Sequence, residues 1–290
     1  MAETTGETSS RRTAAQIFAD AIEVGEEELK RSSPGLMFSG LAAGLGMGLS
    51  GLGSAAVVAT VGHGRSGLLL AALLYPLGFI AVIVGRAQLF TENTLFPVIL
   101  VLDRRRHLLN TVRLWVVVFI ANVLGALLFA VLMVLAHTLT PSLRDSLEYL
   151  GVHAARGSWG GLFWKGIAGG WIIALVAWLV TASRDTTAQI ALIWFATFAI
   201  GAAHLAHCIA GSGEILAAVV GGHVGVGTFF YWLSAATLGN AVGGVVMVSL
   251  LNYGQVVGSG HDTELAARSL EEAERERPGL RRRRRGVPAA

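Results

Sequence analysis

Two polar interruptions inside long apolar windows decide the fold of this chain: Gly85-Arg86-Ala87-Gln88-Leu89-Phe90-Thr91-Glu92-Asn93-Thr94 and Gly201-Ala202-Ala203-His204-Leu205-Ala206-His207-Cys208. The first lies within the window 68–102 and the second within 188–221. Both windows are longer than the roughly 20 residues with which a helix crosses a bilayer. Polar residues at the middle of an overlong apolar window indicate a discontinuous membrane helix.

Four further apolar windows, at 36–60, 109–138, 163–181 and 225–252, surround these two. The chain is 53% hydrophobic with only 14% charged residues, and its mean hydropathy is +0.62. A soluble domain carries about a quarter charged residues. The composition therefore excludes a soluble protein and predicts an all-α membrane protein of six transmembrane helices.

The charge distribution predicts three parts: a cytosolic segment at 1–34, a transmembrane domain at 35–258 and a charged cytosolic tail at 259–290. Arg104, Arg105, Arg106 and Arg113 follow the second window, and Arg184 follows the fourth. Short loops rich in arginine face the cytoplasm. We therefore expect a multi-pass protein of the bacterial inner membrane with both termini in the cytoplasm.

The two halves of the membrane domain show a weak internal repeat. Residues 85–91 align with 201–207 at an offset of 116, Asn122-Val-Leu-Gly125 with Asn240-Ala-Val-Gly243 at 118, and residues 40–44 with 166–170 at 126. A half with three crossings must be followed by a half inserted upside down. The pattern predicts a 3+3 inverted repeat whose broken second and fifth helices meet near the midplane.

The broken segments contain the side chains that we expect to line a solute passage. Thr91 contributes a hydroxyl, His207 an imidazole, and Leu89 and Phe90 apolar rings. Backbone amides freed at helix breaks favour anions, and histidine can donate a hydrogen bond or release a proton near neutral pH. His207 is alternatively a buried packing histidine, but its alignment with Thr91 favours a role in the passage.

Three other polar residues of the breaks have two interpretations each, and Gln88 is a fourth candidate for the lining of the passage. Placing the charged side chains of Arg86 and Glu92 against lipid would cost too much free energy. They therefore either contact the solute or form an ion pair with each other that locks the loop. His204 aligns with Gln88 at the offset of 116, and it either lines the passage or forms a hydrogen bond across the fold. Only Cys208 accompanies the two histidines, so we expect no metal site and no cofactor.

Leu89-Phe90-Thr91 followed by Asn93, and Ala206-His207-Cys208-Ile209-Ala210, resemble the two signature breaks of the formate/nitrite transporter family. The resemblance extends over about residues 20–255. It implies an aquaporin-like shape, pentamers with one pore in each protomer, and passage of small monovalent anions such as formate or nitrite. It also implies a central role for His207, a loop role for Thr91 and a constriction at Leu89 and Phe90.

Several positions depart from the pattern of this family. Ala206 and Gln88 stand where acidic residues are usual, Gly211 replaces an asparagine, and Arg86 and Glu92 replace small residues. The chain therefore resembles a divergent branch. With Ala206 in place of an acid, we expect Arg86 to supply part of the positive field that draws an anion into the passage.

Two other functions are compatible with a helical membrane protein of this composition. A pore for small neutral solutes would need paired Asn-Pro-Ala turns, and a membrane scaffold or sensor would act through its tail. An enzyme is not expected, since no Ser/His/Asp, His-Glu-x-x-His or paired-carboxylate set is present.

The expected partners are the lipid bilayer, a small anion and further copies of the chain. The five arginines at 281–285 are expected to contact anionic lipid headgroups rather than nucleic acid.

Overall fold

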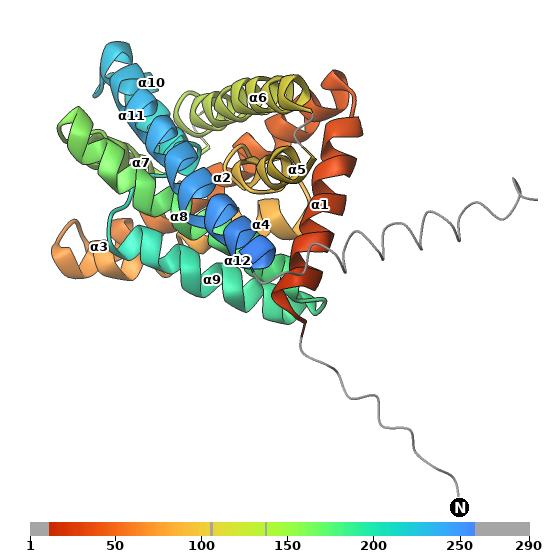
Figure 1. The fold of residues 1–290 in the computed structure, drawn as a ribbon. Coiled ribbons are helices and arrows are strands. Elements are labelled where there is room, and N and C mark those ends of the chain that lie inside the picture. The colour runs from red at the N-terminus through yellow and green to blue at the C-terminus, as the bar shows by residue number, and fades with distance from the viewer. Residues whose placement is uncertain (1–11, 105–106, 137, 259–290) are drawn as a thin grey trace, which may run out of the picture.

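The computed structural model describes residues 12–104, 107–136 and 138–258, and all regular structure in these residues is helical (Figure 1). The elements in order are α1 (Ala14–Lys30), α2 (Ser33–Val61), α3 (Arg65–Ala71), α4 (Pro76–Val84), the 3-10 turn η1 (Glu92–Thr94), α5 (Phe96–Arg104), α6 (Leu108–Val134), α7 (Pro141–Ala154), α8 (Trp159–Ala182), α9 (Thr186–Ala202), α10 (Ala210–Val220), α11 (Val226–Gly244), the π-helical turn η2 (Val245–Leu250) and α12 (Leu251–Gly258).

Five of the described helical stretches are long and apolar enough to cross a membrane: Ser33–Val61, Arg65–Val84, Leu108–Val134, Trp159–Ala182 and Val226–Gly258. The remaining predicted crossing, 188–221, is the fifth in order and consists of the two shorter apolar helices α9 and α10. The second and fifth crossings are broken where the sequence predicted it, after α4 and after α9. An all-α membrane fold is therefore confirmed, whereas the opposite insertion of the two halves stays a prediction.

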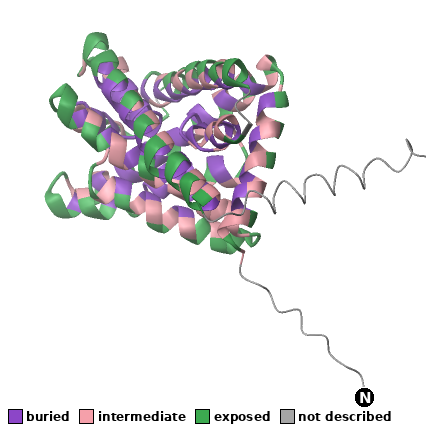
Figure 2. Cartoon of the chain, in the orientation of Figure 1, coloured by how far each residue is buried: buried purple, intermediate pink, exposed green. Residues whose placement is uncertain are grey.

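Exposed residues follow the outer faces of the helices (Figure 2), and many of them are large and apolar. Leu109, Phe38, Trp164 and Phe195 are each at least two-thirds exposed. The buried polar side chains include Ser50, Thr91, Asn93, Asn122, Thr197, His207, Ser212, Glu214, Asn240 and Ser249. Such large exposed apolar surfaces mark contact with lipid or with another protein.

Glycines bring two pairs of helices into backbone contact. A Cβ added at Gly125 of α6 would lie 2.3 Å from the carbonyl oxygen of Leu41 on α2. A Cβ added at Gly243 of α11 would lie 2.1 Å from the carbonyl oxygen of Ile167 on α8. Both contacts lie within one protomer, where a residue without a side chain lets the helix backbones approach closely.

Helix α1 belongs to the folded body, although the sequence placed it in a polar segment at 1–34. The Thr13 hydroxyl and the Gln16 side chain form a reciprocal capping box at its start. Phe18 and Ala21 on its inner face are buried, and α1 packs against α5, α8 and α12. The predicted tail at 259–290, including the arginines at 281–285, lies outside the described residues.

Candidate functional site

One asparagine holds the first helix break. Asn122 on α6 donates from Nδ2 to the carbonyl oxygens of Gly40 and Gln88, both at 2.8 Å. Its Oδ1 accepts the backbone N–H of Phe90 at 2.9 Å. Because Asn122 is fully buried, these bonds satisfy backbone groups that the broken helix would otherwise leave without partners.

The second break is held in the same way by Asn240 on α11. Its Nδ2 donates to the carbonyl oxygens of Gly166 at 2.7 Å and Ala206 at 2.8 Å. Its Oδ1 accepts the backbone N–H of Cys208 at 2.8 Å. The sequence aligned Asn240 with Asn122, and the structure gives the two residues the same three hydrogen bonds.

These bonds correct the predicted alignment of the two breaks from an offset of 116 to one of 118. Gln88 and Ala206 both accept from the asparagine, and Phe90 and Cys208 both donate to it. His207 therefore corresponds to Leu89, and His204 corresponds to Arg86 rather than to Gln88. Arg86 and His204 also share a left-handed backbone, with φ of 56° and 48°. The offset of 116 was wrong because it matched Gly, Ala and Leu residues that have different backbone partners.

Thr91 and His207 meet at the centre, where the two breaks face each other. Thr91 Oγ1 lies 2.8 Å from His207 Nε2, and both side chains are buried. His207 Nδ1 accepts the backbone N–H of Ala210 at 3.1 Å. In the neutral imidazole the proton is then on Nε2, so Nε2 donates to the Thr91 hydroxyl oxygen. The Thr91 O–H stays available as a donor to another group.

Aromatic rings pack around this pair and beside it. Phe79 packs edge-on against the His207 ring at a centroid distance of 4.9 Å. Phe90 packs against Phe119 and Trp115, at centroid distances of 5.1 and 5.8 Å, and its constriction with Leu89 stays a prediction. Phe79 was not identified from the sequence, since nothing in its own helix distinguishes it from other apolar residues.

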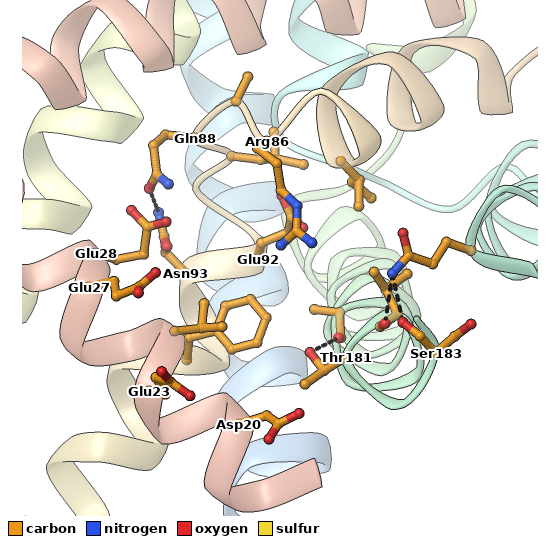
Figure 3. A pocket seen from close by; sticks show the side chains of 18 of the residues that line it. Asp20, Glu23, Glu27, Glu28, Arg86, Gln88, Glu92, Asn93, Thr181 and Ser183 are labelled. Carbon is orange, nitrogen blue, oxygen red and sulfur yellow. Dashed lines mark hydrogen bonds between the residues drawn. The ribbon is translucent and has the colours of Figure 1, made fainter. Parts of the chain in front are cut away.

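A cavity of about 560 Å³ lies on one side of the pair, beneath α1 (Figure 3). We call it the α1 cavity. The first break contributes Arg86, Gln88, Leu89, Glu92 and Asn93 to its lining. Gln88 accepts from Asn93 Nδ2 at 3.1 Å, and its own Nε2 has no acceptor among the described residues. Leu89 is 1% exposed and forms part of the cavity wall.

Arg86 and Glu92 both point into the α1 cavity, as Figure 3 shows. The structure contains no ion pair between these two described residues, so the predicted locking pair is not found. Both side chains line a cavity that water or a solute can enter. The alternative prediction, that they contact the solute, is the one compatible with this placement.

A second cavity, of about 250 Å³, lies on the opposite side of the pair and is lined partly by α7. We call it the α7 cavity. His207 and His204 line it together with Lys165, Arg156 and His153, three residues not identified from the sequence. The only lysine within the fourth apolar window is Lys165, and a charge inside a membrane span is a signal that could have found it.

The two histidines of the α7 cavity lie close together, with a distance of 5.6 Å between the ring centroids of His153 and His204. Partial burial lowers the pKa of His153, and the nearby His204, Arg156 and Lys165 lower it further. His153 is therefore mostly neutral at pH 7. Glu214, which is 8% exposed, is the carboxylate in the lining of this cavity.

The chain is similar to membrane transport proteins over most of its length. The family model for the formate/nitrite transporter matches residues 15–254. The inner membrane protein YfdC of Escherichia coli (strain K12) is 32% identical over 235 residues, which cover 80% of this chain and 75% of that protein. A probable formate transporter of Methanothermobacter thermautotrophicus is 28% identical over 197 residues, which cover 62% of this chain and 72% of that protein.

Solved structures of the same fold agree with this assignment. An FNT family ion channel superimposes with a TM-score of 0.72 at 19% identity, covering 83% of this chain and 97% of that one. A pentameric formate channel with formate bound superimposes with a TM-score of 0.64 at 19% identity, covering 76% and 96%. The match of the family model and the identity with YfdC show that this chain belongs to the formate/nitrite transporter family.

Proposed function

We propose that each protomer conducts a small monovalent anion of the formate or nitrite class between the α1 cavity and the α7 cavity. The observation that carries this proposal is the 2.8 Å contact of Thr91 with His207 between the two cavities. A solute that crosses the protein along this line must pass a hydroxyl and an imidazole that are shielded from water.

The donors around this contact suit an anion. The Thr91 hydroxyl has a proton to donate once Nε2 of His207 has donated to its oxygen. The backbone amides of Leu89, Thr91 and His207 have no acceptor among the described residues, and Leu89 corresponds to His207 between the two breaks. Donors that face a site of low dielectric stabilise negative charge more strongly than they would in water.

Charged residues at the two mouths extend this field. Arg86 lies in the α1 cavity, and its counterpart His204 lies with Lys165 in the α7 cavity. Arginine stays protonated wherever it lies, so Arg86 supplies constant positive charge. Glu92 lies in the same cavity as Arg86 and opposes this effect.

We further propose that the protein is a homo-oligomer, most simply a pentamer, in a bacterial inner membrane with both termini in the cytoplasm. The similarity to a pentameric formate channel and the exposed apolar residues on the outer faces of the helices support an oligomer. Native mass spectrometry in mild detergent tests this arrangement, and a purely monomeric spectrum would contradict it.

The function is tested by flux into proteoliposomes with a panel of formate, nitrite, hydrosulfide, urea and glycerol. We expect the parent to pass the monovalent anions, and we expect His207→Asn and Thr91→Val to slow formate at least about tenfold, a loss of roughly 1.4 kcal/mol of barrier stabilisation. Thr197→Val is the matched control, because Thr197 is buried but its hydroxyl bonds to Ile193 within its own helix.

Two results would reject the proposal. Equal passage of urea and formate by the parent would indicate a pore for neutral solutes. No flux of any panel member, from a preparation that melts cooperatively, would favour a scaffold or sensor.

A further inference from the structure

The carboxyl group in the lining of the α7 cavity belongs to Glu214 of α10. His207, Gly211 and Glu214 are spaced by four and three residues, and all three line this cavity. The Gly211 N–H donates to the His207 carbonyl at 2.9 Å, so helical hydrogen bonding begins at His207. The helix then continues to the exposed residues Gly222 and His223. Glu214 therefore lies between His207 and the exposed end of α10.

Glycines on two neighbouring helices make room for Glu214. A Cβ added at Gly51 of α2 would lie 2.8 Å from Cγ of Glu214. A Cβ added at Gly151 of α7 would lie 2.1 Å from the carbonyl oxygen of Glu214. This close packing leaves the residue 8% exposed, and its accessible part lines the α7 cavity.

The Glu214 carboxyl has no hydrogen bond and no ion pair among the described residues. Glu148 on the adjacent helix α7 is also buried, but it pairs with Arg144 at 3.0 Å and with His223 at 2.9 Å. Burying an ionised carboxyl without a counter-charge costs free energy, whereas the neutral acid needs only an acceptor for its proton. A buried polar group that faces a cavity without a partner indicates a ligand.

A second polar group of the same cavity is also without a partner. Tyr75, at the turn between α3 and α4, is 8% exposed, and its hydroxyl has no hydrogen bond among the described residues. It lies close enough to Glu214 for the two groups to interact electrostatically. Its ring packs against Phe79 at a centroid distance of 5.5 Å, and Phe79 packs against His207. The cavity thus presents two unpartnered O–H groups near the central pair.

The other ionisable groups around Glu214 are mostly basic. Among the helices that pack against α10, α2 contains no ionisable residue, and α6 contains only Arg113, which bonds to the carbonyl oxygens of Leu29 and Arg31. The one ionisable residue of α11 is Tyr231. None of the groups in the described lining forms an ion pair with Glu214. The lining and its surroundings contribute His153, Arg156, Lys165, His204, His207 and Cys208.

We propose that Glu214 and Tyr75 form a site in the α7 cavity for a small anion with two oxygen atoms, and that the proton on Glu214 switches this site. The inference rests on the proposed function. The neutral acid and the phenol each donate a hydrogen bond to one oxygen of the anion. Once Glu214 has lost its proton, it is an acceptor with a negative charge and repels the anion. Arg156 and Lys165 attract an anion into the same cavity, so the proton decides whether the anion advances to His207.

The pH profile of formate flux tests the switch. Proteoliposomes have the same pH inside and outside, and the flux through protein-free liposomes is subtracted. From about pH 5 to about pH 9, the flux of the parent should fall at least about fivefold more than that of Glu214→Gln, because glutamine stays a neutral donor. Asp145→Asn is the control, since Asp145 is exposed on α7 and lies outside the cavity.

Two results of this measurement would show that Glu214 does not act through its proton. One is a pH profile of Glu214→Gln with the same shape as that of the parent. The other is a Glu214→Gln flux that is higher by the same factor at every pH, as expected if Glu214 is ionised throughout. Either result would overturn the proposal.

The two donors are tested separately at about pH 5. We expect Glu214→Leu to slow formate about tenfold and Tyr75→Phe about threefold, while Glu214→Gln stays within about twofold of the parent. Tyr253→Phe is the control for the phenol, because Tyr253 packs on Phe18 outside both cavities. Formate flux at the parent level in Glu214→Leu or in Tyr75→Phe would overturn the two-donor site.

Infrared difference spectra separate this inference from the proposed function, because they need no flux. The C=O stretch of a neutral carboxyl is lost on ionisation and is absent from glutamine. The parent should lose such a band between about pH 5 and about pH 9, and Glu214→Gln should lack it. We expect sodium nitrite, which has no carbonyl group, to shift this band in the parent.

The spectra and the flux give distinct outcomes. A band that Glu214→Gln retains, or one that nitrite does not shift, would overturn the site at Glu214 even if the parent conducts formate. If the band and its shift are observed but no anion crosses the membrane, the proposed function fails and the binding site stands.

Discussion

The two helix breaks share a backbone and differ in their side chains. Asn122 and Asn240 make the same three bonds, and both breaks contain one residue with a left-handed backbone. That residue is Arg86 in the first break and His204 in the second. A symmetric scaffold therefore presents different chemistry on its two sides.

The two cavities show the same contrast on a larger scale. The α1 cavity is about 560 Å³ with five carboxyl and three guanidinium groups, whereas the α7 cavity is about 250 Å³ with Arg156, Lys165, His153, His204 and one carboxyl group. The lining of the α7 cavity therefore favours an anion more than the lining of the α1 cavity does.

The strongest test of the shared scaffold removes its asparagines. Asn122→Ala and Asn240→Ala should each lower the free energy of unfolding by about 3 kcal/mol, because three bonds are lost and buried backbone groups are left unsatisfied. Thermal melting in detergent measures the loss. Asn252→Ala is the control, since its side chain makes one local bond, to Val248. If only one of the two variants loses much of the free energy of unfolding, the two asparagines are not equivalent.

The basic character of the α7 cavity is tested at Lys165. Lys165→Gln should slow formate entry from that side about fivefold at low ionic strength and much less at high salt, because the field of a partly solvated charge is screened. Lys30→Gln is the matched control, since Lys30 is exposed and lies outside both cavities. An equal effect at all salt concentrations would point to a structural role for Lys165.

The opposing charges of the α1 cavity should act in opposite directions. We expect Arg86→Gln to slow formate about threefold and Glu92→Gln to speed it by a similar factor, each through the local potential. Replacing Arg86 with glutamine does not change the backbone strain at this position, because both residues are equally strained at a φ of 56°. If the formate flux of Arg86→Gln equals that of the parent and the flux of Glu92→Gln is no higher, neither side chain affects the anion through its charge.

The smallest effect is expected from pH at His153. Its pKa is lower in the native protein than in the unfolded chain, chiefly through burial. Protonation therefore favours the unfolded chain, and stability is lost as the pH falls below about 6.5. Imidazole NMR should show His153 titrating at a higher pH in Lys165→Gln, because one repelling cation is gone. An unchanged pKa of His153 in this variant would show that Lys165 does not lower it.

Sequence alone determined the membrane class, the apolar windows and the positions of both breaks. These features follow from local rules, because bilayer thickness sets the length of a span and polar residues inside a span are costly. The contact between Thr91 and His207 was also expected, from two broken segments that face each other.

Only the tertiary structure decided the register of the repeat, the packing of Phe79 against His207 and the charge of each cavity. The correct offset depends on bonds from Asn122 to Gly40 and Gln88, which are 82 and 34 residues away. The lining of the α7 cavity brings His153 of α7, Lys165 of α8 and His204 of the second break together. Such groupings cannot be predicted from spacing along one helix, because they arise where side chains of separate helices meet.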